Sequence, residues 1–174
     1  LSLDLSGRTI IGGLAGDYAG VELTKLLLHH RVPTGDAFAV AIPAGAAIGR
    51  IGCLAGGCCF GIPTALPWGI TYPAGSPAWA AQVAAGRIGP DAVRSLPVHP
   101  TQVYEALFDV LLVVVLSLLR SRLRAPASLF RLYLVLYCLY RFLSEFLRGD
   151  SAVPPGGGLK TAQLVLIPAV LLFS

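Results

Sequence analysis

Arginine and glutamate side chains stand near the ends of two apolar segments, at spacings suited to binding an anion. Arg50 lies in one of these segments, while Arg141, Glu145 and Arg148 follow one another at i, i+4 and i+7 near the end of another. On a helix those three share a face, which is expected to point away from lipid because exposed charge is costly there. Guanidinium groups bind phosphate oxygens in pairs, so the pattern predicts a charged pocket for a phosphodiester. The alternative is that such arginines extend to the membrane interface or pair with glutamate.

Four side chains near the predicted pocket could transfer protons: His99, Tyr104, Glu105 and Glu145. General acid–base catalysis needs one such group within hydrogen-bond reach of the reacting atom. His99 and Glu145 are the two candidates for a base, and both stay open. Glu105 has a second interpretation as the ion-pair partner of Arg50 or Arg141, and Tyr104 as an anchor at the membrane interface.

Three of the four cysteines, Cys53, Cys58 and Cys59, follow Arg50 within a short stretch. They are either small apolar side chains in helix packing or thiols activated by the nearby guanidinium, which favours the nucleophilic thiolate. No disulfide framework is evident. No metal site is predicted, because the spacing is not that of paired Cys-x-x-Cys motifs and His99 would have to complete the ligand set.

The composition indicates a membrane protein. Hydrophobic residues make up 55% of the chain and charged residues 13%, and the mean hydropathy is +0.74, outside the usual range of soluble domains. The net charge is +4, but no basic run with interleaved aromatic residues occurs, so nucleic-acid binding is not expected. No removable signal peptide is evident after Leu1, and the sequence does not begin with methionine, so further residues are expected upstream.

The elements that must position these residues are the helices of a single all-α membrane domain, 1–174. About five transmembrane helices are expected, over 8–28, 37–57, 101–119, 128–147 and 159–173. Between the second and third, residues 61–98 are rich in proline and contain both tryptophans, which predicts an extramembrane cap. Within the cap, a short helix is expected from Pro77 to Gly86.

Small residues recur along the second of these segments. Gly45 and Gly49, then Gly52 and Gly56, are each four positions apart. This spacing lets helix backbones approach closely in membranes, so the second helix is expected to lie at the centre of the bundle.

Basic residues in the short loops predict the orientation of the protein. Four arginines lie within 120–131, and the 29–36 loop at the same face has Arg31 beside two histidines. Such loops face the cytoplasm. The cap and the charged residues near it are therefore expected at the outer face of the membrane.

The motifs above stand in an order that resembles the bacterial prolipoprotein diacylglyceryl transferases. The matching positions are Gly49, Arg50, Gly52, Gly57, Gly61, Pro67, Trp68, Gly69, His99, Pro100, Thr101, Gln102, Tyr104, Glu105, Arg141, Glu145 and Arg148. Each motif alone is short, but the combination is specific and the likeness runs from Gly12 to Gln163. Members of that family have additional N-terminal spans.

The resemblance implies transfer of the diacylglyceryl group of phosphatidylglycerol to the lipobox cysteine of a preprolipoprotein, with release of glycerol phosphate. It places this multi-pass enzyme in the bacterial inner membrane, with its site facing the exterior and without a cofactor. Arg50 and Arg141 would hold the phosphate and its developing charge, and His99 or Glu145 would act as the base. The expected substrate-binding residues are Arg50, Gly61, Gln102, Tyr104, Glu105, Arg141 and Arg148.

Three positions differ from the family pattern. Ile11 stands where the family has a histidine before two glycines, Cys53 where it has asparagine, and Cys58 where it has glutamate. Two alternatives to the transferase follow from these differences. One is a divergent membrane enzyme that depends on Cys58 or Cys59, and the other is a non-catalytic lipid-binding or transport protein.

Overall fold

The computed structural model describes residues 10–27, 29, 35–123 and 125–149. Within these residues the secondary structure consists of helices joined by loops, without β-strands. The helices are α1 (Ile10–Leu27), α2 (Gly35–Gly56), α3 (Pro77–Ala84), α4 (Thr101–Leu119) and α5 (Ser128–Ser144). The chain divides into two compact units, Leu1–Pro33 and Thr34–Ser174, and each is described by itself. The single-domain prediction therefore stays a prediction.

The first unit contributes α1, which agrees closely with the helix predicted over 8–28. Its sequence includes Asp17, Glu22 and Lys25. It is not one of the helices that are apolar enough to cross a membrane on their own composition. The predicted span over 159–173 lies outside the described residues.

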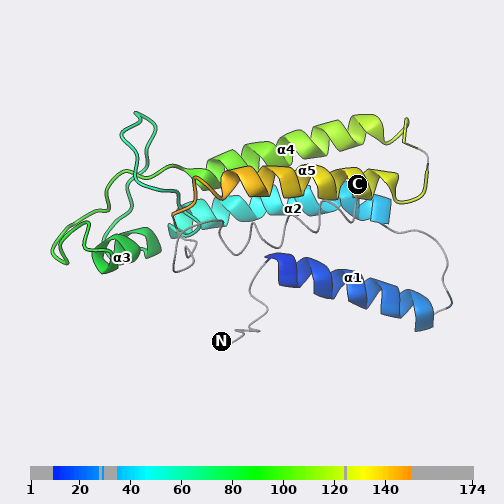
Figure 1. The fold of residues 1–174 in the computed structure, drawn as a ribbon, viewed down its shortest axis with the longest axis horizontal. Helices are drawn as coiled ribbons and strands as arrows, with labels where there is room; N and C mark the ends of the chain where they lie inside the picture. Colours follow the sequence, from blue (N-terminus) through cyan, green and yellow to red (C-terminus); the bar gives the residue numbers. More distant parts are fainter. Residues whose placement is uncertain (1–9, 28, 30–34, 124, 150–174) are drawn as a thin grey trace. The chain divides into compact units, whose positions relative to one another are not determined.

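In the second unit, α2, α4 and α5 run side by side, and α3 lies with the connecting loops at one end (Figure 1). α4 packs along α2, and α5 contacts both. Their shared core is formed by Ala39, Leu112, Leu116, Leu129 and Tyr133. The bounds predicted for α4 are confirmed. α5 begins where predicted but ends at Ser144, earlier than the predicted 147.

Two of these helices, α2 and α4, are long and apolar enough to span a membrane. Their outward faces carry large apolar side chains, among them Ile48, Leu107 and Leu118, each at least 65% exposed. A lipid environment accounts for such faces on long helices, whereas the core helix of a soluble protein would bury them.

The glycines of α2 lie away from its contacts with α4 and α5. A Cβ atom added at Gly45, Gly49, Gly52 or Gly56 would meet nothing within 4 Å among the described residues. The contacts of α2 with its neighbours instead involve the opposite face, which includes the buried Ala39, Pro43 and Arg50. The prediction that these glycines bring helix backbones together therefore stays a prediction, since the contacts of α2 with α4 and α5 do not use them.

The cap predicted over 61–98 forms at the end of the bundle where α2 ends and α4 begins (Figure 1). The predicted short helix is confirmed as α3, which starts after Ser76, whose hydroxyl accepts a hydrogen bond from Trp79 N as an N-cap. The cap has a core of its own, formed by Phe60, Tyr72, Ala78 and Val98. This core fixes the loops that lead into the candidate site.

Candidate functional site

The predicted arginines converge on one carboxylate. Glu105, in the second turn of α4, lies 2.5 Å from Arg50 of α2, 3.2 Å from Arg148 and 3.7 Å from Arg141 of α5. Arg141 also contacts Glu145, one helical turn further on, at 2.8 Å. These five residues, here called the arginine cluster, join all three long helices at the cap end.

The arginine cluster is withdrawn from solvent. Glu145 is fully buried, Glu105 is 2% exposed, and Arg50 and Arg148 are 8% exposed. Buried charges of this kind are costly unless each is paired, and the ion pairs of the cluster link three guanidiniums to the carboxylates of Glu105 and Glu145. The arrangement holds guanidinium donors in place, and such donors can bind an anion bidentately.

A close backbone crossing brings the end of α5 beside the start of α4. Gly61 N donates to His99 O, Ile62 N donates to Leu147 O, and Gly149 N donates to Phe60 O. Gly61 pairs with Arg148 in an isolated bridge, and a Cβ at Gly61 would lie 2.8 Å from Leu147 O. Gly61, predicted to bind substrate, therefore supports the position of Arg148 through the backbone.

His99 belongs to a separate group of side chains. Its Nδ1 lies 3.3 Å from the Tyr104 hydroxyl, which accepts a hydrogen bond of 2.9 Å from Trp68 Nε1. Which of the two donates in the His99–Tyr104 hydrogen bond depends on the tautomer of the imidazole. Among the described residues, no hydrogen bond or ion pair is found between His99 and the arginine cluster. The structure thus groups His99 with Tyr104, and Glu145 with Arg141.

Gln102 and Thr101 fasten the turn after α2 to the start of α4. Gln102 Nε2 donates to Cys58 O at 2.6 Å and to the Tyr72 hydroxyl at 3.1 Å. Thr101 Oγ1 donates to Cys59 O at 2.6 Å. Gln102 is 1% exposed and positions this turn, while its predicted role in substrate binding stays a prediction.

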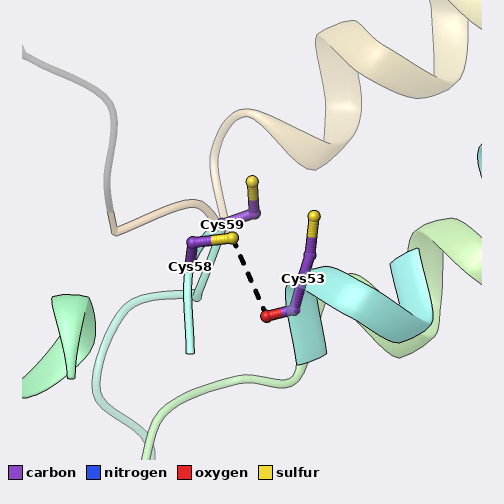
Figure 2. Close-up of side chains that lie close together, drawn as sticks. All are labelled: Cys53, Cys58 and Cys59. Carbon is purple, nitrogen blue, oxygen red and sulfur yellow. Dashed lines mark hydrogen bonds between the residues drawn. The ribbon is translucent and has the colours of Figure 1, made fainter. Parts of the chain in front are cut away.

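The three candidate thiols come together at this turn. The sulfur atoms of Cys53, Cys58 and Cys59, here called the cysteine cluster, lie within 4.8 Å of one another (Figure 2). Burial raises the pKa of the Cys58 thiol to about 11, and a contact with Cys53 adds to this effect. Cys58 is therefore protonated at neutral pH and is not an activated nucleophile in the free protein.

Two hollows adjoin the arginine cluster. One, of about 370 Å³, lies between α2 and α4 and has apolar walls, including Ile51, Leu54 and Leu107, with Arg50 and Gln102 in its lining. The other, of about 360 Å³, lies between the cap and the crossing at Gly61, and its lining includes Arg87 and Arg148. Arginines of the cluster thus line both hollows, the apolar one through Arg50 and the more polar one through Arg148.

Sequence reasoning assigned no site role to three residues around the site, although Trp68 is among the positions that match the family pattern. Asp109 is 4% exposed and follows Glu105 by one turn of α4. An acidic residue inside an otherwise apolar segment was the available signal. Trp68 and Tyr72, which bond to Tyr104 and Gln102, come from the cap, and nothing in their sequence neighbourhood indicated those partners.

The fold and the buried charges define a class: a helical protein with two helices able to cross a membrane and a guanidinium-rich site at one end of them. The family model for prolipoprotein diacylglyceryl transferase matches residues 3–174. The chain belongs to this family, as its motifs predicted.

Curated relatives agree with this assignment. The phosphatidylglycerol–prolipoprotein diacylglyceryl transferase 2 of Clostridium perfringens is 31% identical, over 97% of this chain and 62% of the relative. The transferase of Cereibacter sphaeroides strain ATCC 17029 is 36% identical, over 92% of this chain and 60% of the relative. The transferase of Clostridium tetani is 33% identical, over 71% of this chain and 44% of the relative. The chain thus spans about three fifths or less of the length of these relatives.

Proposed function

We propose that this chain carries the site of a phosphatidylglycerol–prolipoprotein diacylglyceryl transferase. Phosphatidylglycerol and a prolipoprotein are the substrates that the names of its relatives give. The observation that carries the proposal is the arginine cluster, where guanidiniums from α2 and from the end of α5 meet at Glu105 beside an apolar hollow.

The lipid is proposed to bind with its acyl chains along α2 and α4 and its phosphate at the arginines. The apolar hollow between these helices suits a hydrocarbon chain of the lipid. Arg50 in its lining would then meet the phosphate of the same lipid molecule. Guanidinium groups bind such oxygens bidentately. Glu105 would keep Arg50 and Arg148 oriented before the lipid arrives, which reduces the reorganisation needed during the reaction.

In the proposed reaction, the acceptor sulfur bonds to the carbon of the diacylglyceryl group that carries the phosphate ester. The bond between that carbon and the ester oxygen breaks, and its electron pair leaves with the glycerol phosphate. Arg50 and Arg141 stabilise the charge that develops on the phosphate. The thiol proton passes to a base, for which His99 is favoured over Glu145, because Glu145 is fully buried and bound to Arg141.

The membrane arrangement is part of the same proposal. α2 and α4 have the composition of spans, and the chain is proposed to cross the bacterial inner membrane five times with the cap outside. The arginine-rich loop between α4 and α5 would face the cytoplasm. The site would then lie at the level of the outer headgroups, where both substrates meet.

The test incubates the purified protein in detergent with phosphatidylglycerol and a lipobox peptide, and follows the diacylglyceryl-modified peptide by mass spectrometry. Arg141→Ala is expected to lower the rate by roughly 100-fold or more, the usual effect of removing one donor from a developing charge. Arg94→Ala is the matched control, since Arg94 lies on the cap and bonds to Thr71. It should leave the rate within about twofold of the parent, as is usual for surface substitutions.

Two outcomes contradict the proposal. Equal modification by the parent and Arg141→Ala would remove the arginine cluster from the reaction. Phosphatidylglycerol that co-purifies with the parent but yields no product, with every lipobox peptide tested, would instead assign a non-catalytic lipid-binding role.

A further inference from the structure

The cysteine cluster lies beside the arginine cluster but has no role in the reaction described above. Cys53 is in the last turn of α2, one turn after Arg50, and Cys58 and Cys59 follow in the turn. Figure 2 shows the side chains of Cys53 and Cys59 pointing in the same direction, with that of Cys58 extending towards Cys53. Their three sulfurs are within 4.8 Å of one another.

The backbone is built to bring these thiols together. Gly57 has a left-handed φ of 66°, and the hydrogen bonds from Gly57 N to Leu54 O and from Cys58 N to Cys53 O form a Schellman motif at the end of α2. Cys59 is also left-handed, with φ at 56°, a conformation that costs energy for a residue with a side chain. These two left-handed residues fold the chain back, so that Cys58 and Cys59 return to Cys53.

Contacts from other elements hold the turn in this form. The carbonyls of Cys58 and Cys59 accept hydrogen bonds from Gln102 and Thr101 of α4. A set of donors held by its surroundings is what a metal site requires. The carbonyl end of α2 also favours a cation there, because it is the negative end of the helix dipole.

We propose that Cys53, Cys58 and Cys59 bind a thiophilic divalent metal ion of the zinc class through their three sulfurs, with a fourth position open to an incoming thiol. Tetrahedral thiolate ligands lie roughly 3.8 Å apart when each bond to zinc is about 2.3 Å. The sulfurs therefore need to approach one another by only about 1 Å from their present separations. All three side chains are partly exposed, so an ion can reach them.

The ligand set defines what the ion can do. Binding of the ion releases the thiol protons to solvent, so that three thiolates face the metal. Three thiolates and one divalent ion leave one negative charge, which the nearby guanidinium of Arg50 offsets. Three protein ligands leave the fourth position free, as in catalytic rather than structural zinc sites. A thiol bound there loses its proton and becomes a nucleophile beside the arginine cluster. This last role, as the place where the acceptor cysteine is held, rests on the proposed function.

Metal binding is tested without reference to activity. The full chain is purified with a phosphine reductant, stripped with a chelator and titrated with Zn²⁺ or Co²⁺ alone, and bound metal is measured by elemental analysis and by the cobalt–thiolate absorption. One ion per chain is expected. Cys53→Ser, Cys58→Ser and Cys59→Ser should each weaken binding by roughly 10- to 100-fold or more. Cys138→Ala is the matched control, because Cys138 is buried in α5 and should leave binding unchanged.

The results separate this inference from the proposed function. Absence of bound metal from the reduced parent, or binding that Cys138→Ala and the three serine variants affect equally, would overturn the site. Where metal binds, a lipobox peptide should alter the cobalt absorption and the same peptide with serine in place of cysteine should not. An unchanged spectrum with both peptides would overturn the role of the fourth position, while transfer activity is measured independently.

Discussion

Glu105 is the residue on which the arginines of the site depend. It contacts guanidiniums from α2, from α5 and from the segment after α5, and it is almost fully buried. Removing one member of a buried ion pair leaves the others without compensation, and the cost exceeds the value of the pair itself. Glu105 is therefore expected to matter for stability as well as for binding.

We predict that Glu105→Gln destabilises the protein by about 3 to 5 kcal/mol, the usual cost of breaking a buried charge pair. Thermal unfolding in detergent, with bound phosphatidylglycerol measured in parallel, checks this. Asp91→Asn is the control, since Asp91 is exposed on the cap and its replacement should change stability by no more than about 0.5 kcal/mol. Equal unfolding temperatures for Glu105→Gln and the parent would mean that the arginines are held by other contacts.

Between elements, stability depends on how the ends of the helices meet. At the cap end, Gly61 passes between the start of α4 and the segment after α5, in contact with backbone on both sides. At the other end, the Asp36 carboxylate accepts hydrogen bonds from Ala127 N and Phe130 N and so caps the start of α5 from α2. Both contacts fix the position of α5 and therefore of Arg141.

Gly61→Ala is expected to lower stability by about 1 to 3 kcal/mol, the typical cost of overpacking. Its Cβ would lie 2.7 Å from His99 O and 2.8 Å from Leu147 O, and neither backbone can move without breaking the crossing. The same thermal unfolding assay measures this effect. Gly52→Ala is the matched control, because the added methyl would meet no atom of the described residues within 4 Å and alanine favours the helix. Equal unfolding temperatures for Gly61→Ala and Gly52→Ala would mean that the backbone crossing at Gly61 is not rigid.

The helices could be predicted from the sequence where local signals are strong. α4 lies between Pro100 and the run of arginines that begins at Arg120, and an apolar run with such limits has well-defined ends. Ser76 and Pro77 marked the start of α3 in the same way. The role predicted for the glycines of α2 stays a prediction, because their spacing permits close packing but does not identify a partner.

The site was predictable in its membership but only in part in its connections. Charged residues in apolar segments indicated Arg50, Arg141 and Glu105. The pairing of Glu105 with Arg50 or Arg141 was also among the interpretations of the sequence, and the structure pairs Glu105 with both. That Arg148 joins them at the same carboxylate depends on how α2, α4 and the segment after α5 pack, which no local pattern records. The convergence of the thiols likewise depends on the left-handed backbone of Cys59, a conformation that its residue type does not favour.

At the scale of the whole molecule, the distribution of charge relates the site to the membrane. The exposed apolar faces of α2 and α4 lie between the cap and the arginine-rich turn after α4. Arg120 and Arg122 lie in that turn and Arg131 lies in α5, whereas the cap has Arg87 and Arg94 over a much longer stretch. Short loops with dense positive charge stay in the cytoplasm, so the cap and the site should face outward.

We predict that alkaline phosphatase inserted at Gly89, in an exposed turn of the cap, is active in intact bacterial cells, because the enzyme matures only outside the inner membrane. The same insertion at Arg122, in the turn between α4 and α5, should be inactive, and a fluorescent protein placed there should fluoresce. Each insertion serves as the control for the other, since both lie in exposed loops. Phosphatase activity at Arg122 but not at Gly89 would reverse the orientation, and would place the arginine cluster at the cytoplasmic headgroups, away from substrates that have already crossed the membrane.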